Sequence, residues 1–280
     1  ADPDGRRGAD REKLTPAQMA RPAITKPYTD SMANRYQWCV AAVPSVAWAK
    51  KTSPEDRSNT AVERLWELIL RVSRADRKDP LTDWMWHNRS LRAKCDKLND
   101  LGFKELEYRS ANGTRLRVGL IEQAQFISGK KCTVGGNYFN PNIPTEECFT
   151  TPARGRAEGI VYAVKPLSYG GGLIEDFWLR FEEGRAVACG AKKNAAMLEK
   201  ILAMDEGASY LGECALVPYD SPINETGILF YNTLFDENAC CHLALGRGYS
   251  NTIVGFEKYS HADFAAMGVN DPSVHVDFMV

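Results

Sequence analysis

Residues 104–121 read KELEYRSANGTRLRVGLI, and here the sequence changes from a helical pattern to strands and tight turns. Two strand-like segments, 104–109 and 115–121, flank Asn112-Gly113, a dipeptide favoured in hairpin turns because both residues tolerate a positive φ angle. The stretch therefore predicts a β-hairpin, the first element of a strand-rich second part of the chain.

The residues after this hairpin continue the strand pattern. A second tight turn is predicted at Glu182 to Arg185. The other predicted elements are strands at 173–181 and 186–191, a helix at 194–204, and strands at 213–217 and 274–280.

The residues before the hairpin are mainly helical, and Pro80 stands at a first-turn position where a helix begins. Between Tyr36 and Val43, a short apolar run suits a buried strand, whose partners lie elsewhere in the chain or are absent from it. We therefore predict an α+β fold, with residues 1–102 as an α/β region and 103–280 as a β-rich one. A further helix is predicted from Pro54 to Asp76, with one apolar face made by Val62, Leu65, Trp66, Leu68, Ile69 and Val72.

Composition narrows the class of protein. A chain of 280 residues can bury a core without disulfide or metal staples. Its 35 basic and 36 acidic residues argue against a nucleic-acid binder and against a binder of anionic membranes. No stretch approaches the roughly 20 apolar residues of a membrane helix, and Ala1 to Arg11 lacks the apolar segment of a secretory signal. The eight cysteines include no C-x-x-C pair, so we expect reduced thiols and a cytoplasmic protein.

Two histidines are candidates for chemistry. His275 and Asp277 lie two apart in a strand-like run, so both side chains project from one face and can chelate or flank a divalent metal. A structural hydrogen-bonded pair explains the same spacing. His242 ends the segment 236–242, which is too polar for an ordinary core element, and the alternative for this histidine is a satisfied helix end at the surface.

Two glutamates complete the set. Glu146-Glu147 lies in a proline-bracketed loop, which holds side chains in place without regular structure. Glu213 begins an apolar strand, where a buried acid needs a cation or strong hydrogen bonds; taken singly, both sites also read as exposed glutamates. Together with Tyr249, these acids and imidazoles suit zinc, cobalt, manganese or iron better than calcium. A thiolate zinc site at Cys240-Cys241 is less favoured, since no second cysteine pair has finger-like spacing.

Four longer motifs carry a family resemblance. They read NIPTEECFT at 142–150, LGECALVP at 211–218, LFYNTLFDENA at 229–239 and SVHVDFM at 273–279. In this order they closely resemble the aminopeptidase T family of dinuclear metallo-aminopeptidases, and weaker similarity runs back to residue 1.

The resemblance implies a metal-dependent aminopeptidase that uses two divalent ions, zinc or cobalt and in some cases manganese or magnesium, to remove N-terminal residues from peptides. It also implies a homodimer. The implied ligands are Glu147, Glu213, His242, His275 and Asp277, with Glu213 as the bridging carboxylate. Tyr249 is implied at or beside the metals, as a ligand or as a donor to the developing oxyanion. Glu237 is an outer-shell partner or a ligand, and the proton shuttle is left open between Glu147 and Glu237.

Two rival interpretations remain. His242, His275 and Asp277 alone satisfy the 2-His-1-carboxylate triad of a mononuclear Fe(II) ring-cleaving dioxygenase, the related dihydroxypyridine class. Alternatively, the chain is an inactive metal-binding fragment. Family members are longer at both ends, so we expect flanking chain to be missing, with residues 1–102 as the remnant of an N-terminal α/β domain and 103–280 as the catalytic metal-binding domain.

Overall fold

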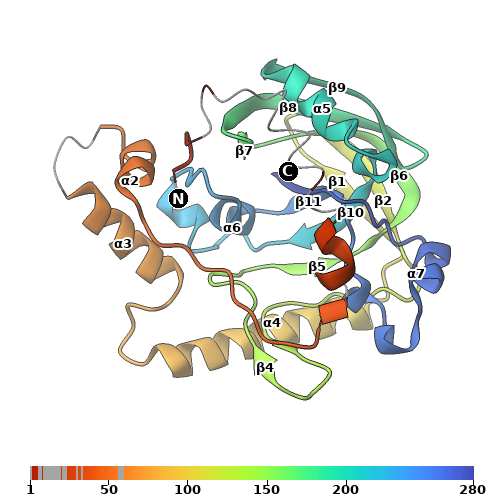
Figure 1. Cartoon of the computed structure of the whole chain (residues 1–280), viewed down its shortest axis with the longest axis horizontal. Helices are drawn as coiled ribbons and strands as arrows, with labels where there is room; N and C mark the ends of the chain where they lie inside the picture. The colour runs from red at the N-terminus through yellow and green to blue at the C-terminus, as the bar shows by residue number, and fades with distance from the viewer. Residues whose placement is uncertain are drawn as a thin grey trace.

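A computed structural model describes residues 2–5, 8, 20, 24–29, 31–32, 34–55 and 60–280, and these form two large antiparallel sheets and a two-stranded ribbon with helices around them (Figure 1). The helices are α2 Val46–Thr52, α3 Ala61–Val72, α4 Pro80–Asp100, α5 Ala195–Leu202, α6 Thr233–Asp236 and α7 His261–Met267. The strands are β1 Glu105–Arg109, β2 Arg115–Leu120, β3 Lys131–Cys132, β4 Tyr138–Phe139, β5 Cys148–Thr150, β6 Pro152–Tyr162, β7 Leu167–Tyr169, β8 Gly172–Glu182, β9 Arg185–Lys193, β10 Leu211–Leu216, β11 His242–Gly246 and β12 His275–Met279. This mixture confirms the predicted α+β class.

The larger sheet has the order β1-β2-β6-β8-β7, with β9 paired to β8. A four-stranded sheet follows the order β12-β11-β10-β5, and β3 and β4 form a two-stranded ribbon. The main core draws on both large sheets and on α5, which lies beside β8 and β9 in Figure 1. Its buried side chains include Leu116, Val118, Phe177, Leu179, Leu198, Cys214, Leu243, Leu245, Val276 and Phe278.

Both predicted hairpins are confirmed. β1 pairs with β2, and Gly113 has the positive φ angle, 103°, that its turn requires. Asn112 does not share this conformation; its side-chain oxygen instead accepts a hydrogen bond of 3.0 Å from the Thr114 N–H. In the second hairpin, Glu183 and Gly184 are the two loop residues between β8 and β9 and both have a positive φ, at 49° and 78°.

The predicted helices form with adjusted ends. α4 begins at Pro80, and the Asp79 side chain caps it by accepting from the Thr82 N–H at 3.2 Å. α3 covers only Ala61–Val72 of the predicted 54–76, and residues 56–59 lie outside the described part of the chain. Its buried face is narrower than predicted, since Trp66 is 36% exposed.

The predicted buried strand from Tyr36 to Val43 is wrong. Only Val40 makes a β-bridge, to Asn142, and the side chains of Val40 and Val43 are 46% and 65% exposed. The reason is the partner: Val40 donates to the Pro141 carbonyl at 2.7 Å and accepts from the Ile143 N–H at 3.0 Å, so this segment pairs with a loop instead of a sheet.

The helices of the first third pack against a distant segment of the chain. Trp48 of α2 and Leu65 of α3 share a core with Phe230, Leu234 and Phe235, and the Trp48 indole N–H donates to the Phe230 carbonyl at 2.5 Å. A division near residue 102 therefore stays a prediction. In the described ranges, no helix combines the length and the apolar character needed to cross a bilayer.

Candidate metal centre

One face of the four-stranded sheet gathers the candidate ligands. Ala244 of β11 lies opposite Glu213 of β10 on one side and opposite Asp277 of β12 on the other. Because side chains two apart in a strand share a face, His242 and His275 project from this face as well. The small Ala244 side chain leaves the space between the two carboxylates open. The opposite face carries the apolar residues of the main core.

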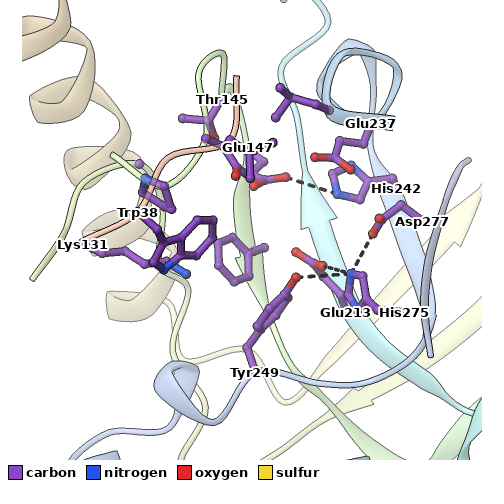
Figure 2. A pocket seen from close by; sticks show the side chains of 16 residues that line it. Trp38, Lys131, Thr145, Glu147, Glu213, Glu237, His242, Tyr249, His275 and Asp277 are labelled. Atoms are coloured by element: carbon purple, nitrogen blue, oxygen red, sulfur yellow. Dashed lines mark hydrogen bonds and ion pairs between the residues drawn. The ribbon is translucent and has the colours of Figure 1, made fainter. Parts of the chain in front are cut away.

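Glu147 reaches the same space from the loop before β5, the strand that pairs with β10. Figure 2 shows its carboxylate facing His242, and the Glu147 Oε2 to His242 Nε2 distance is 3.2 Å. The neighbouring Glu146 faces the other way, because Arg74 binds both of its oxygens, at 2.5 and 3.0 Å. The Glu146 N–H also donates to the Asn238 side chain at 2.7 Å. These contacts fix the loop, and Glu147 is therefore held toward the sheet.

Two groups of donor atoms lie close enough to hold metal ions. Glu147, Glu213 and His242 form one group and Glu213, His275 and Asp277 the other, each with its donor atoms within 4.8 Å of one another. The Nε2 atom of His275 lies 3.2 Å from Glu213, 3.0 Å from Asp277 and 3.3 Å from the Tyr249 hydroxyl. One ring N–H cannot serve three oxygens, whereas a cation can. Glu213 belongs to both groups.

The second nitrogen of each imidazole supports this interpretation. His275 Nδ1 lies 2.7 Å from the Arg247 carbonyl oxygen, and His242 Nδ1 lies 3.4 Å from that of Cys240. A carbonyl oxygen only accepts, so Nδ1 keeps its proton in the neutral ring, and Nε2 is the nitrogen that can bind a metal. The residues present therefore fit divalent ions with mixed oxygen and nitrogen ligands.

The pKa shifts of the buried acids and histidines also favour a bound cation. Burial raises the pKa of Glu213, and burial together with Asp277 raises the pKa of Glu237 well above its ordinary value. Burial opposes ionisation of Asp277 too, but His275 outweighs it and holds the pKa of that carboxyl below the ordinary value. Burial alone would lower the pKa of His242, yet Glu147 and the other carboxylates raise it to about 9. Buried acids in this number are stable as anions only beside positive charge.

A cavity of about 300 Å³ opens onto these groups. Glu237 and Tyr249 line it, as do Trp38, Lys131 and Phe149. Burial raises the pKa of the Tyr249 hydroxyl well above its ordinary value, and the surrounding carboxylates add to that shift. The Tyr249 ring packs edge-on against Phe149, with ring centroids 5.4 Å apart, which fixes the hydroxyl near His275.

The structure thus brings together all the side chains that the sequence offered as ligands, with Glu237 beside them. Cys240 and Cys241 belong to neither donor group, and the Cys241 thiol instead contacts the backbone of Val217. Sequence reasoning missed Lys131 and Trp38, because neither lies in a motif. Arg74 was missed as well, although the unexplained second acid in Glu146-Glu147 was a signal that a buried cation stood nearby.

Similarity to known proteins agrees with this geometry. The family model described as thermophilic metalloprotease (M29) matches residues 1–280. Aminopeptidase T of Thermus thermophilus is 42% identical over 281 residues, and aminopeptidase AmpS of Bacillus subtilis is 39% identical over 281. Each match covers 100% of this chain and 68% of the relative.

Solved structures give the same result. Wild-type AmpT from Thermus thermophilus matches with a TM-score of 0.89 and 40% identity, covering 100% of this chain and 68% of that one. A 2,5-dihydroxypyridine dioxygenase from Pseudomonas putida matches with a TM-score of only 0.46 and 13% identity, which supports no argument about activity. On the family match and the identities to its aminopeptidases, the chain belongs to the M29 family of thermophilic metalloproteases.

Proposed function

We propose that this metal-dependent aminopeptidase removes the N-terminal residue of a peptide with two divalent ions held by Glu147, Glu213, His242, His275 and Asp277. The observation that carries the proposal is the pair of donor groups that share Glu213. A carboxylate with two oxygens between two sites is suited to bridge two ions. The mixture of carboxylates and imidazoles, without thiolates, favours zinc or cobalt, with manganese or magnesium as weaker candidates.

When bound, the ions supply Lewis acidity, which lowers the pKa of a water molecule and polarises the scissile carbonyl. The chain's own residues do the rest. Glu237 lines the cavity outside both donor groups, so we assign it the transfer of the water proton to the leaving amine, in preference to Glu147. Tyr249, whose hydroxyl lies 3.3 Å from His275, borders the second group as a ligand or hydrogen-bond donor. Carboxylates in the cavity attract the substrate's free α-amine.

The dioxygenase alternative needs only His242, His275 and Asp277. It leaves unexplained why Glu147 and Glu213 are buried beside them, since a mononuclear site has no use for two further acids. The two-ion aminopeptidase uses all five side chains, and family membership favours it.

The cellular setting is proposed on other grounds. All eight cysteines are free, including the neighbouring buried thiols of Cys95 and Cys148, which supports a reducing compartment such as the cytoplasm. A homodimer is proposed on the family resemblance, and light scattering of the purified protein measures it.

Metal analysis and an activity assay test the proposal together. We expect two equivalents of zinc or cobalt per chain, and turnover of an aminoacyl-p-nitroanilide when cobalt is added to metal-free protein. Glu213→Gln should lose both the two bound metal equivalents and the turnover, because the amide cannot bridge two cations. Glu122→Gln replaces an exposed glutamate and should retain both. One oxygen-sensitive iron per chain would support the dioxygenase, and two bound ions without turnover would support an inactive fragment.

A further inference from the structure

Lys131 projects into the metal cavity but belongs to neither donor group. It lies in β3, opposite Phe139 of β4, and Figure 2 shows it beside Trp38, across the cavity from His242 and His275. Among the described residues that line this cavity, it is the only lysine or arginine. A cation at this place is not a metal ligand, so its presence needs a separate explanation.

Within the protein, the carboxylates of Glu213 and Glu147 attract the Lys131 ammonium group, but neither reaches it directly. Lys131 Nζ makes no ion pair or hydrogen bond with any residue of the described ranges. Its nearest ring contacts are Phe149 and Tyr249, whose centroids lie 5.5 and 5.6 Å away. Cation–π contacts at this distance are weak compared with the cost of desolvating an ammonium group that has no hydrogen-bond partner. The balance favours a negatively charged ligand as the partner of Lys131.

The preceding lysine provides a contrast. Lys130 Nζ lies 4.0 Å from the Tyr138 ring centroid and lines a neighbouring cavity but not the metal cavity. Lys130 is exposed, and Lys131 is half-buried. Two adjacent residues of the same type thus have different surroundings, and only Lys131 faces the metal ligands.

Lys131 also stands where three cavities meet. Besides the metal cavity, it lines a second of about 300 Å³, near Arg247 and Ser250, and a third of about 780 Å³, near Arg89 and Phe126. These spaces give a peptide whose N-terminal residue lies among the metal ligands a path outward past Lys131. For a peptide on this path, the first peptide bond lies between the ligands and Lys131.

We propose that Lys131 is a catalytic residue that donates a hydrogen bond to the oxygen of the scissile carbonyl as this oxygen becomes negatively charged. The inference rests on the metal site proposed above. Attack of water forms a C–O bond and moves the carbonyl π electrons onto the oxygen. When the intermediate collapses, these electrons restore C=O, the C–N bond breaks, and the proton from the water ends on the leaving amine. Lys131 keeps its own protons and stabilises only the charge on the oxygen.

Three variants test this role. Lys131→Met removes the charge and keeps the length, Lys131→Arg keeps the charge, and Lys130→Met is the matched control. Each is examined for metal content, melting temperature, and kcat and KM on leucyl-p-nitroanilide and on leucyl-glycine, which alone carries a carboxylate. Binding of an α-aminophosphonic acid, an anionic mimic of the tetrahedral intermediate, and of leucinol, which has the α-amine but no anionic group and no amide bond, is measured by calorimetry, which needs no turnover.

For Lys131→Met, we expect kcat to fall about 10²–10³-fold on both substrates, with KM changed little. Phosphonate affinity should fall by a comparable factor while leucinol affinity and metal content hold, since only the phosphonate carries the charge of the intermediate. Lys131→Arg should recover part of kcat, and Lys130→Met should match the wild type.

Three results would overturn the inference. The first is a kcat of Lys131→Met within threefold of the wild type. The second is a change confined to a higher KM for leucyl-glycine, which would assign Lys131 to the substrate carboxylate. The third is a loss of bound metal from Lys131→Met, which would make Lys131 a structural residue. Failure of the metal site itself is recognised separately, because the wild type would then bind no metal and hydrolyse neither substrate.

Discussion

Metal binding to this site should release protons, and the number follows from the two imidazoles. In the metal-free protein, neighbouring carboxylates raise the pKa of His242 to about 9 and that of His275 well above its ordinary value. Both rings therefore carry a second proton at pH 7. A metal ion binds only the neutral ring, so filling both donor groups should release about two imidazole protons per chain, and any proton held by Glu213, whose pKa burial also raises, adds to this number.

The same protonation sets the pH dependence of affinity. The pKa of His242, about 9, lies some two units above pH 7. The proton on this ring must be removed before a metal ion binds, and this cost lowers metal affinity at pH 7 about 100-fold, or about 2.7 kcal/mol. Affinity should therefore rise with pH from 6 to 9. The slope of log affinity for filling both groups should approach 2 and decrease near pH 9, where His242 loses its proton.

Calorimetry measures the proton count directly. Zinc is titrated into metal-free protein at pH 7 in buffers that differ in ionisation enthalpy, and the slope of apparent enthalpy against that quantity gives the protons released. His261→Asn is the matched control, because His261 is exposed, pairs with Asp271 and lies outside the cavity. It should leave the count unchanged, whereas His242→Asn should lower it by about one. Release of fewer than one proton by the wild type, or an affinity independent of pH, would refute the reasoning.

Three other perturbations follow from the site. Asp277→Asn should reduce bound metal from two ions to one per chain, measured by elemental analysis, because Asp277 belongs only to the second donor group; retention of both would place the second ion elsewhere. Arg74→Met should destabilise the protein by about 3–5 kcal/mol in urea unfolding, because it leaves the carboxylate of Glu146 buried with only His87, 3.8 Å away and with its pKa lowered by burial, beside it. Its kcat should fall too, since the loop that holds Glu147 loses its anchor, and an unchanged midpoint and kcat would contradict this. The metal-free protein should lose stability as pH rises from about 6.5 to 9: the folded pKa of His242, about 9, exceeds its ordinary 6.5, so the contribution is complete below 6.5 and lost through 9. Urea midpoints across this range should fall by an amount equivalent to up to about 3 kcal/mol, and a rise would reverse the assigned protonation.

Local sequence patterns predicted the elements whose conformation is set locally. The turn at Glu183-Gly184 has two residues with positive φ, and Pro80 is favoured in the first turn of α4, so both were recognised without knowledge of the rest of the chain. The run from Tyr36 to Val43 has the composition of a strand, but whether it joins a sheet depends on a partner. Its partner is the loop at Pro141 to Ile143, which is far away in the sequence, and no local pattern reports this.

The candidate site likewise has features that a local sequence pattern predicts and features that it does not predict. His275 and Asp277 are two apart in one strand, so their shared face follows from the period of the strand. Strand register places both Glu213 and Asp277 opposite Ala244. The sequence motifs predict that these two residues lie together only through the family resemblance. No sequence pattern predicted Lys131 as a site residue, because its proposed role depends on three cavities that meet at the ribbon of β3 and β4.

The pair Glu146-Glu147 explains how the helices of the first third support the chemistry of the second part. Glu146 is held by Arg74, which follows α3, while Glu147 faces His242 at the start of β11. Since the two glutamates are adjacent, a shift of Arg74 must move the backbone between them and with it the carboxylate in the metal site. Trp38 and Val40 line the cavity from the same third. The proposed metal ligands all lie within 147–277, but the geometry that brings them together depends on residues before 102.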